Sequence, residues 1–413
     1  MNIKVVIRNL FKHPFLNLVK IIGLGLALSG IVFISLFLKS ELTYDRHHDK
    51  SNRIYRITLT DPDFLGGKHF ARIVNPGYLP DVKERLPEVL DFVRLRPVRG
   101  GLINHKERYS NVTQGFECDS TFFQVFKAEL VVGNKQTVLE NPASMVVAES
   151  FAQKIFGQAN PVGEVLTLPA GQYYGQTQNF TIAGVMKDFP AQSHFHPDFV
   201  TTPVQDQFQF GWAWTYLVLA EGANTDNVRT GISDFLIERA QIDPEEMDTK
   251  VHLQKLTDIH LHSNKLREIE ANGNMRNIYV LAIAALILLL ISIINYANLN
   301  IGMAGFNAKY LFINKLLGSS KRSVTGYFFT EGVFIVGASV LLALMISVPI
   351  NSIVIRLYNL NLLEGNFYSV IFILTFFTLL SLFFGMLPVL KSVFSSVRLG
   401  ANRNTSPLIG KNG

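Results

Sequence analysis

Four long runs of apolar residues stand out in the pattern of hydrophobic and polar positions along the chain. They cover residues 21–40, 276–300, 324–350 and 367–390, and each holds very few charged side chains. A helix of roughly 20 apolar residues crosses the ~30 Å hydrocarbon core of a bilayer. The pattern therefore predicts an integral membrane α-helical protein with four transmembrane helices, one before and three after a long segment of mixed polarity.

The segment of mixed polarity, residues 41–275, alternates short strand-like and helix-like patterns. Alternating or β-branched runs predict strands at 55–59, 144–148, 180–185 and 216–219. Apolar residues at helical spacing predict helices at 79–86, 150–156 and 227–239. Gly and Pro turns separate these runs. The segment is therefore expected to fold as a large mixed α/β domain.

Residues 1–20 have the pattern of a helix that lies in the membrane interface. Apolar side chains share one face and basic ones follow four apart: Ile3, Val6, Ile7, Leu10 and Phe11 against Lys4, Arg8 and Lys12. Pro14 is expected to end this helix before the first transmembrane helix begins. The first transmembrane run ends in Lys39, Ser40 and Glu41 without a small-residue cleavage site, which predicts an uncleaved anchor.

Most basic residues outside the mixed segment lie in three stretches. Residues 1–20, 301–323 and 391–413 hold twelve Lys and Arg and no Asp or Glu. Short basic flanks of transmembrane helices stay in the cytoplasm. Both termini and residues 301–323 are therefore expected inside, whereas the α/β domain and the short loop 351–366 face outside. The formal net charge of +6 reflects this topology and predicts no nucleic-acid partner.

Small and polar residues occur within the first two transmembrane runs. Gly23, Ala27 and Gly30 are spaced by four and three, which lets another helix approach closely; the alternative is that glycine is simply frequent in membrane helices. Asn295 and Asn298 are one helical turn apart and are expected to hydrogen-bond within the bundle rather than face lipid. These five residues are candidate helix-packing positions.

The chain carries no motif of a known catalytic site, so no catalytic residue is assigned and no enzyme is predicted. It lacks the G-x-x-x-x-G-K-[ST] phosphate loop, the G-x-S-x-G elbow and the H-E-x-x-H zinc motif. We therefore expect no ATP hydrolysis by this chain alone.

Histidine groups and a single cysteine are the remaining candidates for chemistry. The groups that resemble metal ligands are His194, His196 and Asp198, then His260 and His262, then His47 and His48. Alternating histidines can hold zinc, but the pairs lie far apart in sequence, and we favour turns and domain contacts over a metal site. Cys118 is the one cysteine, which excludes an internal disulfide and predicts a small buried apolar side chain.

Several longer stretches resemble one family of membrane proteins. The stretch SELTYDRHHDKSNRIYRIT, residues 40–58, is similar to the start of the outer domain in MacB/FtsX-like ABC transporter permeases, especially those of Bacteroidota type. Further matches follow in order along nearly the whole chain: FFQVFKAELVVG, NPASMVVAESFAQKIFG, NPVGEVLTL, FTIAGVMKDFPAQSHFHPDF, LTDIHLHS and INYANL. Their order makes the resemblance more specific than any single motif.

The resemblance implies a mechanotransmission permease in a bacterial inner membrane, with the α/β domain in the periplasm. Its expected partners are membrane lipids, a second permease subunit, identical or different, and a cytoplasmic ABC ATPase that binds ATP and Mg. This chain itself is expected to hold no cofactor. The conformational change that accompanies closure of the ATPase would be transmitted along the helices to the periplasmic domain. This movement would export or extract a hydrophobic or amphipathic substrate such as a drug, peptide, lipid or lipoprotein. The alternative is an FtsX-like scaffold or signalling subunit that activates a periplasmic adaptor or partner protein without transport.

The resemblance also places the ATPase contact between the second and third apolar runs. The positions that carry it are Phe306, Lys309, Tyr310, Ile313, Asn314, Lys315, Gly318, Lys321 and Arg322. Lys309, Lys315 and Gly318 match the family pattern, whereas Tyr310 replaces an acid, Phe312 a glycine and Asn314 an arginine. Either the ATPase compensates for the two missing charges, or coupling is weakened or lost, or the segment is a plain cytoplasmic amphipathic loop.

Overall fold

The computed structural model describes residues 3–60, 67–98, 102–106, 108–168, 177–203, 208, 211–241, 249–316, 320–358 and 360–402. The chain divides into two compact units. The helical unit comprises Met1–Ser40 and Arg276–Gly413, and the other unit, which we call the outer domain, comprises Glu41–Met275.

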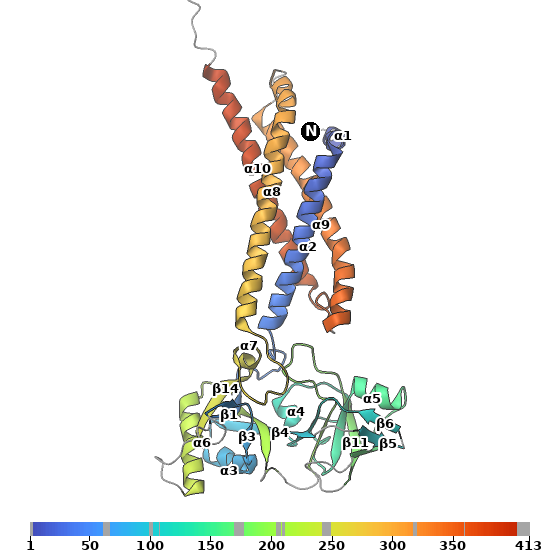
Figure 1. Ribbon diagram of the computed structural model, residues 1–413, viewed down its shortest axis with the longest axis vertical. Coiled ribbons are helices and arrows are strands. Elements are labelled where there is room, and N and C mark those ends of the chain that lie inside the picture. The colour runs from blue at the N-terminus through green and yellow to red at the C-terminus, as the bar shows by residue number, and fades with distance from the viewer. Residues whose placement is uncertain are drawn as a thin grey trace, which may run out of the picture. The chain divides into compact units, whose positions relative to one another are not determined.

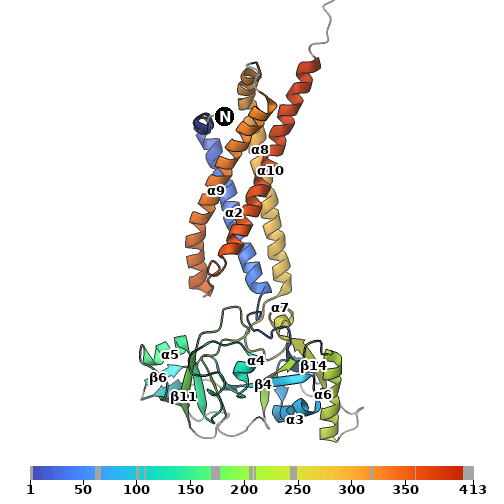
Figure 2. The same cartoon turned by 180° about the vertical axis from the view of Figure 1, so that it is seen from behind.

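The helical unit is built from long apolar helices, and the described part of the chain has four that could span a membrane by their length and composition. They are α2 (Pro14–Leu42), α8 (Met275–Leu316), α9 (Lys321–Tyr358) and α10 (Phe367–Asn402). Figures 1 and 2 show them side by side in two opposite views. The predicted layout, one helix before and three after a mixed α/β domain, is confirmed.

A short helix, α1 (Ile3–Leu10), precedes α2. Pro14 takes the first helical position of α2, where a backbone N–H would have no intrahelical partner. Across the break, the Asn17 side-chain amide donates to the Leu10 carbonyl at 2.8 Å. The helix predicted at the start of the chain is thus present and ends before Pro14, while its place in the membrane interface stays a prediction.

The helices of the bundle pack around Tyr296 of α8. Tyr296 joins an apolar cluster with Leu24 and Leu28 of α2 and Val336 of α9. Its ring also lies against Gly385 of α10, where a side chain would collide with it. The small residue at this point therefore allows α10 to approach α8 closely.

The outer domain contains one mixed sheet with 14 strands among the described residues. The strand order is β14-β1-β13-β4-β7-β12-β9-β11-β10-β5-β6, while β2 pairs with β1, β3 with β13 and β8 with β11. The pairs β12–β7 and β11–β9 are parallel, whereas β1–β13 and β13–β4 are antiparallel. The strands are β1 (Ile54–Thr60), β2 (His69–Phe70), β3 (Ile73–Val74), β4 (Val89–Val98), β5 (Leu102–His105), β6 (Arg108–Asn111), β7 (Gly115–Cys118), β8 (Leu130–Val132), β9 (Ser144–Ala148), β10 (Val165–Leu168), β11 (Gln178–Met186), β12 (Phe199–Thr201), β13 (Trp212–Leu219) and β14 (Lys250–Lys255).

Two apolar clusters hold this sheet to its helices. The helices are α3 (Leu79–Arg85), α4 (Phe122–Val125), α5 (Glu149–Phe156), α6 (Thr225–Ala240) and α7 (Ile259–His262). Val82 of α3 and Ile232 of α6 pack on Ile57 and Leu217 of the neighbouring strands β1 and β13. The larger cluster contains α4, part of α5 and Cys118, whose side chain is fully buried as predicted.

The elements predicted for this domain are confirmed. The strands predicted at 55–59, 144–148, 180–185 and 216–219 lie in β1, β9, β11 and β13, and the three predicted helices are α3, α5 and α6. Helix α6 begins after Asn224, whose side chain accepts hydrogen bonds from the backbone N–H groups of Asp226 and Asn227. Such an N-cap satisfies donors that the helix itself cannot.

Candidate functional site

Two segments connect the outer domain to the helices that precede and follow it. The first connecting segment, residues 41–51, begins with the last two residues of α2, and the second, residues 256–274, leads into α8. They meet where His260 Nε2 lies 2.9 Å from Glu41 Oε2. The Tyr44 ring also stacks on the His260 ring at 3.4 Å. Any shift of one segment therefore acts on the other.

Gly273 lies beside this contact, and its lack of a side chain leaves space for the side chains of His260 and Glu41. A Cβ at this position would lie 2.7 Å from His260 Nε2 and 3.0 Å from Glu41 Oε2. Both distances are shorter than an ordinary van der Waals contact, so a side chain here would push the histidine and the carboxylate apart.

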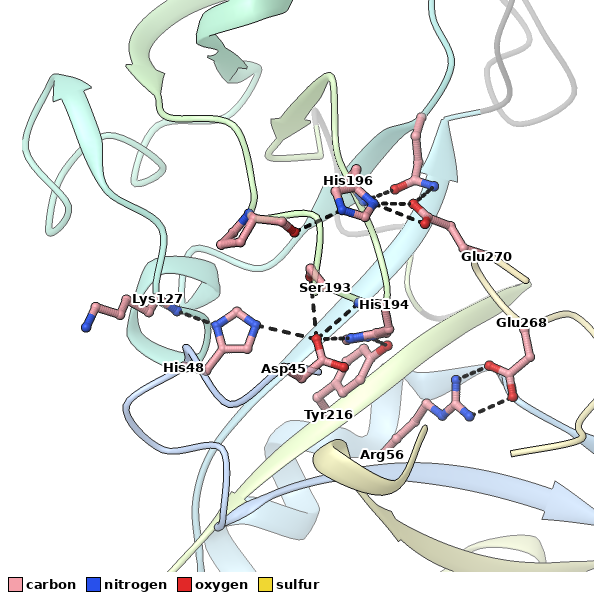
Figure 3. Close-up of polar contacts among 12 residues, drawn as sticks. Asp45, His48, Arg56, Lys127, Ser193, His194, His196, Tyr216, Glu268 and Glu270 are labelled. Atoms are coloured by element: carbon pink, nitrogen blue, oxygen red, sulfur yellow. Dashed lines mark hydrogen bonds and ion pairs between the residues drawn. The ribbon is translucent and has the colours of Figure 1, made fainter. Parts of the chain in front are cut away.

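Asp45 ties the first connecting segment to the core of the domain (Figure 3). Its side chain is fully buried, and Oδ1 accepts hydrogen bonds from the His194 backbone N–H at 3.1 Å and from His194 Nδ1 at 2.8 Å. His194 Nε2 lies 2.8 Å from the Tyr216 hydroxyl of β13. Burial opposes the ionisation of Asp45, but the charge and hydrogen bonds of His194 outweigh it and hold the pKa of this carboxyl below its usual value.

The neighbouring histidines are structural. His48 Nδ1 accepts a hydrogen bond from the Lys127 backbone N–H at 3.0 Å, and its ring packs against Phe126. Burial lowers the pKa of His48 to about 3, and burial also lowers the pKa of His47. Both rings are therefore neutral near pH 7.

The second connecting segment is held by two charged pairs. The Arg56 guanidinium of β1 is fully buried and binds both carboxylate oxygens of Glu268, with Nη2–Oε1 at 2.9 Å (Figure 3). Burial opposes ionisation of Glu268, but Arg56 outweighs it and lowers the pKa of this carboxyl. Further along, His196 Nδ1 lies 2.9 Å from Glu270 Oε1.

His196 is surrounded by hydrogen-bond acceptors. Its Nε2 faces the Pro190 carbonyl at 3.0 Å, while Nδ1 faces Glu270, so both ring nitrogens donate when the ring is protonated. Burial works against the charged ring, yet the Glu270 carboxylate outweighs it and raises the pKa of His196. At Glu270, burial opposes ionisation of the carboxyl group. The hydrogen bond and charge of His196 outweigh this effect, so the pKa of Glu270 is lowered.

Backbone contacts complete the attachment of the second connecting segment. The Leu266 N–H donates to the His69 carbonyl at 2.8 Å, and the Ala71 N–H donates to the Leu266 carbonyl at 2.9 Å. Trp214 Nε1 of β13 donates to the Arg267 carbonyl at 2.9 Å. The two connecting segments are therefore fixed to each other and to the strands β1, β2 and β13.

The predicted histidine groups thus take part in contacts between segments. Among the described residues, no three His, Cys, Asp or Glu side chains come together in a way that could hold a metal ion. His194 and His260 each face a carboxylate, and the Asp198 carboxylate accepts from the Gln114 backbone N–H at 3.0 Å. The sequence did not point to Arg56, Glu268 or Glu270, although Arg56 lies inside the stretch that carried the family resemblance.

The helix-packing positions differ in their surroundings. Ala27 is buried, and a Cβ on Gly30 would lie 3.0 Å from Leu288 Cδ2 of α8, whereas Gly23 has open space around it. The closest approach to α9 is at Gly25, where a Cβ would lie 2.9 Å from Leu342 Cδ2 and 3.1 Å from the Ser339 carbonyl oxygen. The sequence analysis did not select Gly25.

Asn295 and Asn298 line a groove of about 550 Å³ between α2 and α8, together with Lys20 and Gly23. Both asparagine side chains are exposed, and the described residues give neither of them a hydrogen bond. Asn300, two residues beyond Asn298 on α8, makes such bonds instead: its Oδ1 accepts from Lys20 Nζ, and its Nδ2 donates to the Gly385 carbonyl. The expected bonds of Asn295 and Asn298 stay a prediction for a partner outside this chain.

The predicted ATPase contact continues the second transmembrane helix. Helix α8 runs unbroken for 42 residues to Leu316, so that Phe306, Lys309, Tyr310, Ile313, Asn314 and Lys315 lie on it. Gly318 and the side chains of residues 304–319 and of Lys321 lie outside the described residues. Lys321 begins α9, and the Arg322 side chain is exposed. The role of these residues stays a prediction.

Comparisons with known proteins agree with the layout of the outer domain. The model of the MacB-like periplasmic core domain matches residues 18–235, more than half of the chain, from within α2 to within α6. No curated protein matches the chain.

Solved structures that resemble the chain are domains of membrane proteins. A domain of a protein described as a permease from Porphyromonas gingivalis is 18% identical, with 56% of this chain and 99% of that domain covered and a TM-score of 0.41. The periplasmic region of MacB from Actinobacillus actinomycetemcomitans is 13% identical, with 50% and 90% covered and a TM-score of 0.36. The extracellular domain of the noncanonical ABC-type transporter YknZ from Gram-positive bacteria is 12% identical, with 48% and 99% covered and a TM-score of 0.36.

Proposed function

This chain belongs to the MacB/FtsX-like family of ABC transporter permeases, and on that basis we propose that it carries movement between a cytoplasmic ATPase and its own outer domain. The purpose of this movement would be the export or extraction of a hydrophobic or amphipathic substrate such as a drug, peptide, lipid or lipoprotein. The chain would act as a multi-pass protein of a bacterial inner membrane, with both termini in the cytoplasm.

The contact between Glu41 and His260 is the observation that carries this proposal. Glu41 lies in the last turn of α2 and His260 in the segment that precedes α8, and the two side chains meet at 2.9 Å inside the outer domain. Arg56 with Glu268 and Asp45 with His194 then join these segments to the sheet. A displacement of either helix would therefore be delivered to the sheet through hydrogen bonds accepted by carboxylate groups, which are stronger than hydrogen bonds between neutral groups.

The ATPase would be a separate chain, because this sequence has no phosphate loop. Its contact would lie on the last turns of α8 and the start of α9, where Lys309, Lys315, Lys321 and Arg322 concentrate positive charge. The partner ATPase, and not this chain, would bind ATP and Mg.

A second permease subunit, identical or different, would complete the assembly. Asn295 and Asn298 are polar and exposed on a helix of membrane-spanning composition. Exposure of amide side chains to hydrocarbon is costly, so a facing helix with hydrogen-bonding groups is the partner that their chemistry favours.

The test is affinity purification of the tagged full-length chain from its own membranes in mild detergent, followed by mass spectrometry and an ATPase assay. We expect a phosphate-loop ATPase to be recovered, and its turnover to fall when Lys315→Glu and Lys321→Glu are combined. Lys391→Glu with Lys411→Glu is the matched control, since it changes the net charge equally in the C-terminal stretch, outside the proposed contact. Recovery of a periplasmic protein without any ATPase would instead establish the scaffold or signalling function.

A further inference from the structure

A buried cation lies among the helices of the bundle. Lys20 of α2 is only 3% exposed, although it lies within a helix of membrane-spanning composition. Its Nζ donates to Asn300 Oδ1 of α8 at 2.7 Å, and Asn300 Nδ2 donates to the Gly385 carbonyl of α10 at 3.1 Å. Ionisable side chains inside membrane helices are rare and costly, and they are usually functional.

A half-buried carboxyl group on α9 lies near enough to attract this cation. Glu331 interacts electrostatically with Lys20 and with His13. Lys20 and Glu331 do not form a direct ion pair within the described residues, and Glu331 Oε2 is buried there without a hydrogen-bond partner. A buried carboxylate oxygen without a donor is costly to keep. Glu331 thus offers Lys20 a second acceptor that is unused in this conformation.

We propose that Lys20 is a positioning residue with two alternative partners, Asn300 on α8 in the conformation described above and Glu331 on α9 in a second conformation of the bundle. The inference rests on the proposed function, because the exchange would accompany the movement that the ATPase drives. Lysine suits this role, since its ammonium is a compact charge on a flexible four-carbon stem and can move between acceptors. Two discrete contacts of one residue are the kind of bistable element through which a signal can pass along packed helices.

The packing of α2 against α8 and α9 would allow α2 to move toward one of these helices and away from the other. At Gly30 a Cβ would lie 3.0 Å from Leu288 Cδ2 of α8, and at Gly25 a Cβ would lie 3.2 Å from Leu342 Cβ of α9. The helix is therefore close to both neighbours through positions that carry no side chain. A small rotation or slide of α2 can strengthen one contact at the expense of the other.

These same positions allow each contact to be measured by disulfide cross-linking in the full-length protein. Gly30→Cys with Leu288→Cys reports α2 against α8, because the Leu288 side chain faces Gly30, and Gly25→Cys with Leu342→Cys reports α2 against α9, where a Cβ on Gly25 would lie 3.2 Å from Leu342 Cβ. Cys118 can stay in place, because it is fully buried and burial raises the pKa of its thiol, which keeps it unreactive.

Asn300→Ala and Asn300→Asp form a matched pair for the test. Both lose the bond to Gly385, but only Asp keeps an acceptor for Lys20 and adds charge to it. We expect Asn300→Ala to shift the ratio of cross-links toward α9 and Asn300→Asp to shift it toward α8, each by about fivefold or more. Glu331→Gln should act in the direction of Asn300→Asp, and Lys20→Met should abolish the difference between the pair. His13→Gln controls for the histidine near Glu331 and should leave the ratio unchanged.

Shifts in the same direction for Asn300→Ala and Asn300→Asp, or no shift, would overturn the proposal, because a purely structural asparagine responds equally to both changes. The link to function is read in the two cysteine-pair proteins without further changes, by adding the purified ATPase with a non-hydrolysable ATP analogue. This addition should change the cross-link ratio, and much less so when Lys20→Met is also present. If no ATPase is recovered at all, the proposed function fails, while the opposed shifts in the isolated protein still decide whether Lys20 exchanges partners.

Discussion

Asp45 and His194 form a buried hydrogen bond of 2.8 Å that joins the first connecting segment to the loop before β12. Asp45 adopts a positive φ of 58°, a conformation that aspartate tolerates better than most residues. His194 in turn contacts the hydroxyl group of Tyr216, a fully buried residue of β13. The residue that follows α2 by three positions is thus attached directly to the core of the outer domain.

Asp45→Asn is expected to destabilise the outer domain by about 1–3 kcal/mol, because it removes the charge from a buried, hydrogen-bonded acceptor. Both tryptophans of the chain, Trp212 and Trp214, lie in β13, so their fluorescence during urea unfolding reports this domain. Asp49→Asn, at an exposed surface pair with Lys127, is the control and should leave the stability of the domain unchanged. Equal stability of all three proteins would mean that the Asp45 contact contributes nothing.

The pH dependence of this contact follows from the lowered pKa of Asp45. A carboxyl group whose pKa is below its usual value of 3.8 in the folded protein stabilises the fold above that value. The stabilisation is lost as the pH falls through the folded-state pKa. Unfolding at pH 7 and at pH 3 should therefore differ more for wild type than for Asp45→Asn.

The raised pKa of His196 predicts a pH dependence of stability with the opposite sign, at higher pH. Its pKa is raised above 6.5 by Glu270, so its contribution to stability is complete below pH 6.5 and is lost as the pH rises through the folded-state pKa. The pair is about one-third exposed, which makes the contribution small. Hydrogen exchange of residues 264–272 should accelerate between pH 6 and pH 8.5 beyond its intrinsic increase. In His196→Gln this excess should disappear, and its persistence there would assign it to another group.

Arg56→Lys is expected to cost about 3 kcal/mol or more, although it keeps the charge. The guanidinium is fully buried and binds both oxygens of Glu268, and a lysine ammonium cannot make this two-pronged contact. Lys83→Arg at the partly exposed pair with Asp91 is the matched exchange and should change stability by less than about 0.5 kcal/mol. Urea unfolding followed by tryptophan fluorescence compares the two, and similar losses would indicate a general intolerance of Lys and Arg exchange.

Local periodicity explains why the elements could be predicted and their contacts could not. Strands such as β9 and helices such as α6 have patterns that are complete within a few residues. The meeting of Glu41 with His260 joins positions 219 residues apart, and no local pattern encodes it. The rotation of the transmembrane helices is equally hidden, because α2 is apolar around its whole circumference and the sequence does not show which glycine faces α9. Gly25 and Asn300 were missed for this reason.

Gly273→Ala tests whether contact between the two connecting segments is needed for coupling. The added Cβ would lie 2.7 Å from His260 Nε2 and should separate it from Glu41, at a cost of about 1–3 kcal/mol typical of overpacking. Gly302→Ala on α8 is the control, because a Cβ there has open space and alanine favours a helix. In the complex with the purified ATPase, we expect Gly273→Ala to reduce the response of ATP turnover to the permease by about fivefold, while Gly302→Ala leaves it unchanged. Folding is checked separately by tryptophan fluorescence. A normally folded Gly273→Ala protein with full ATPase response would show that movement reaches the outer domain by another route.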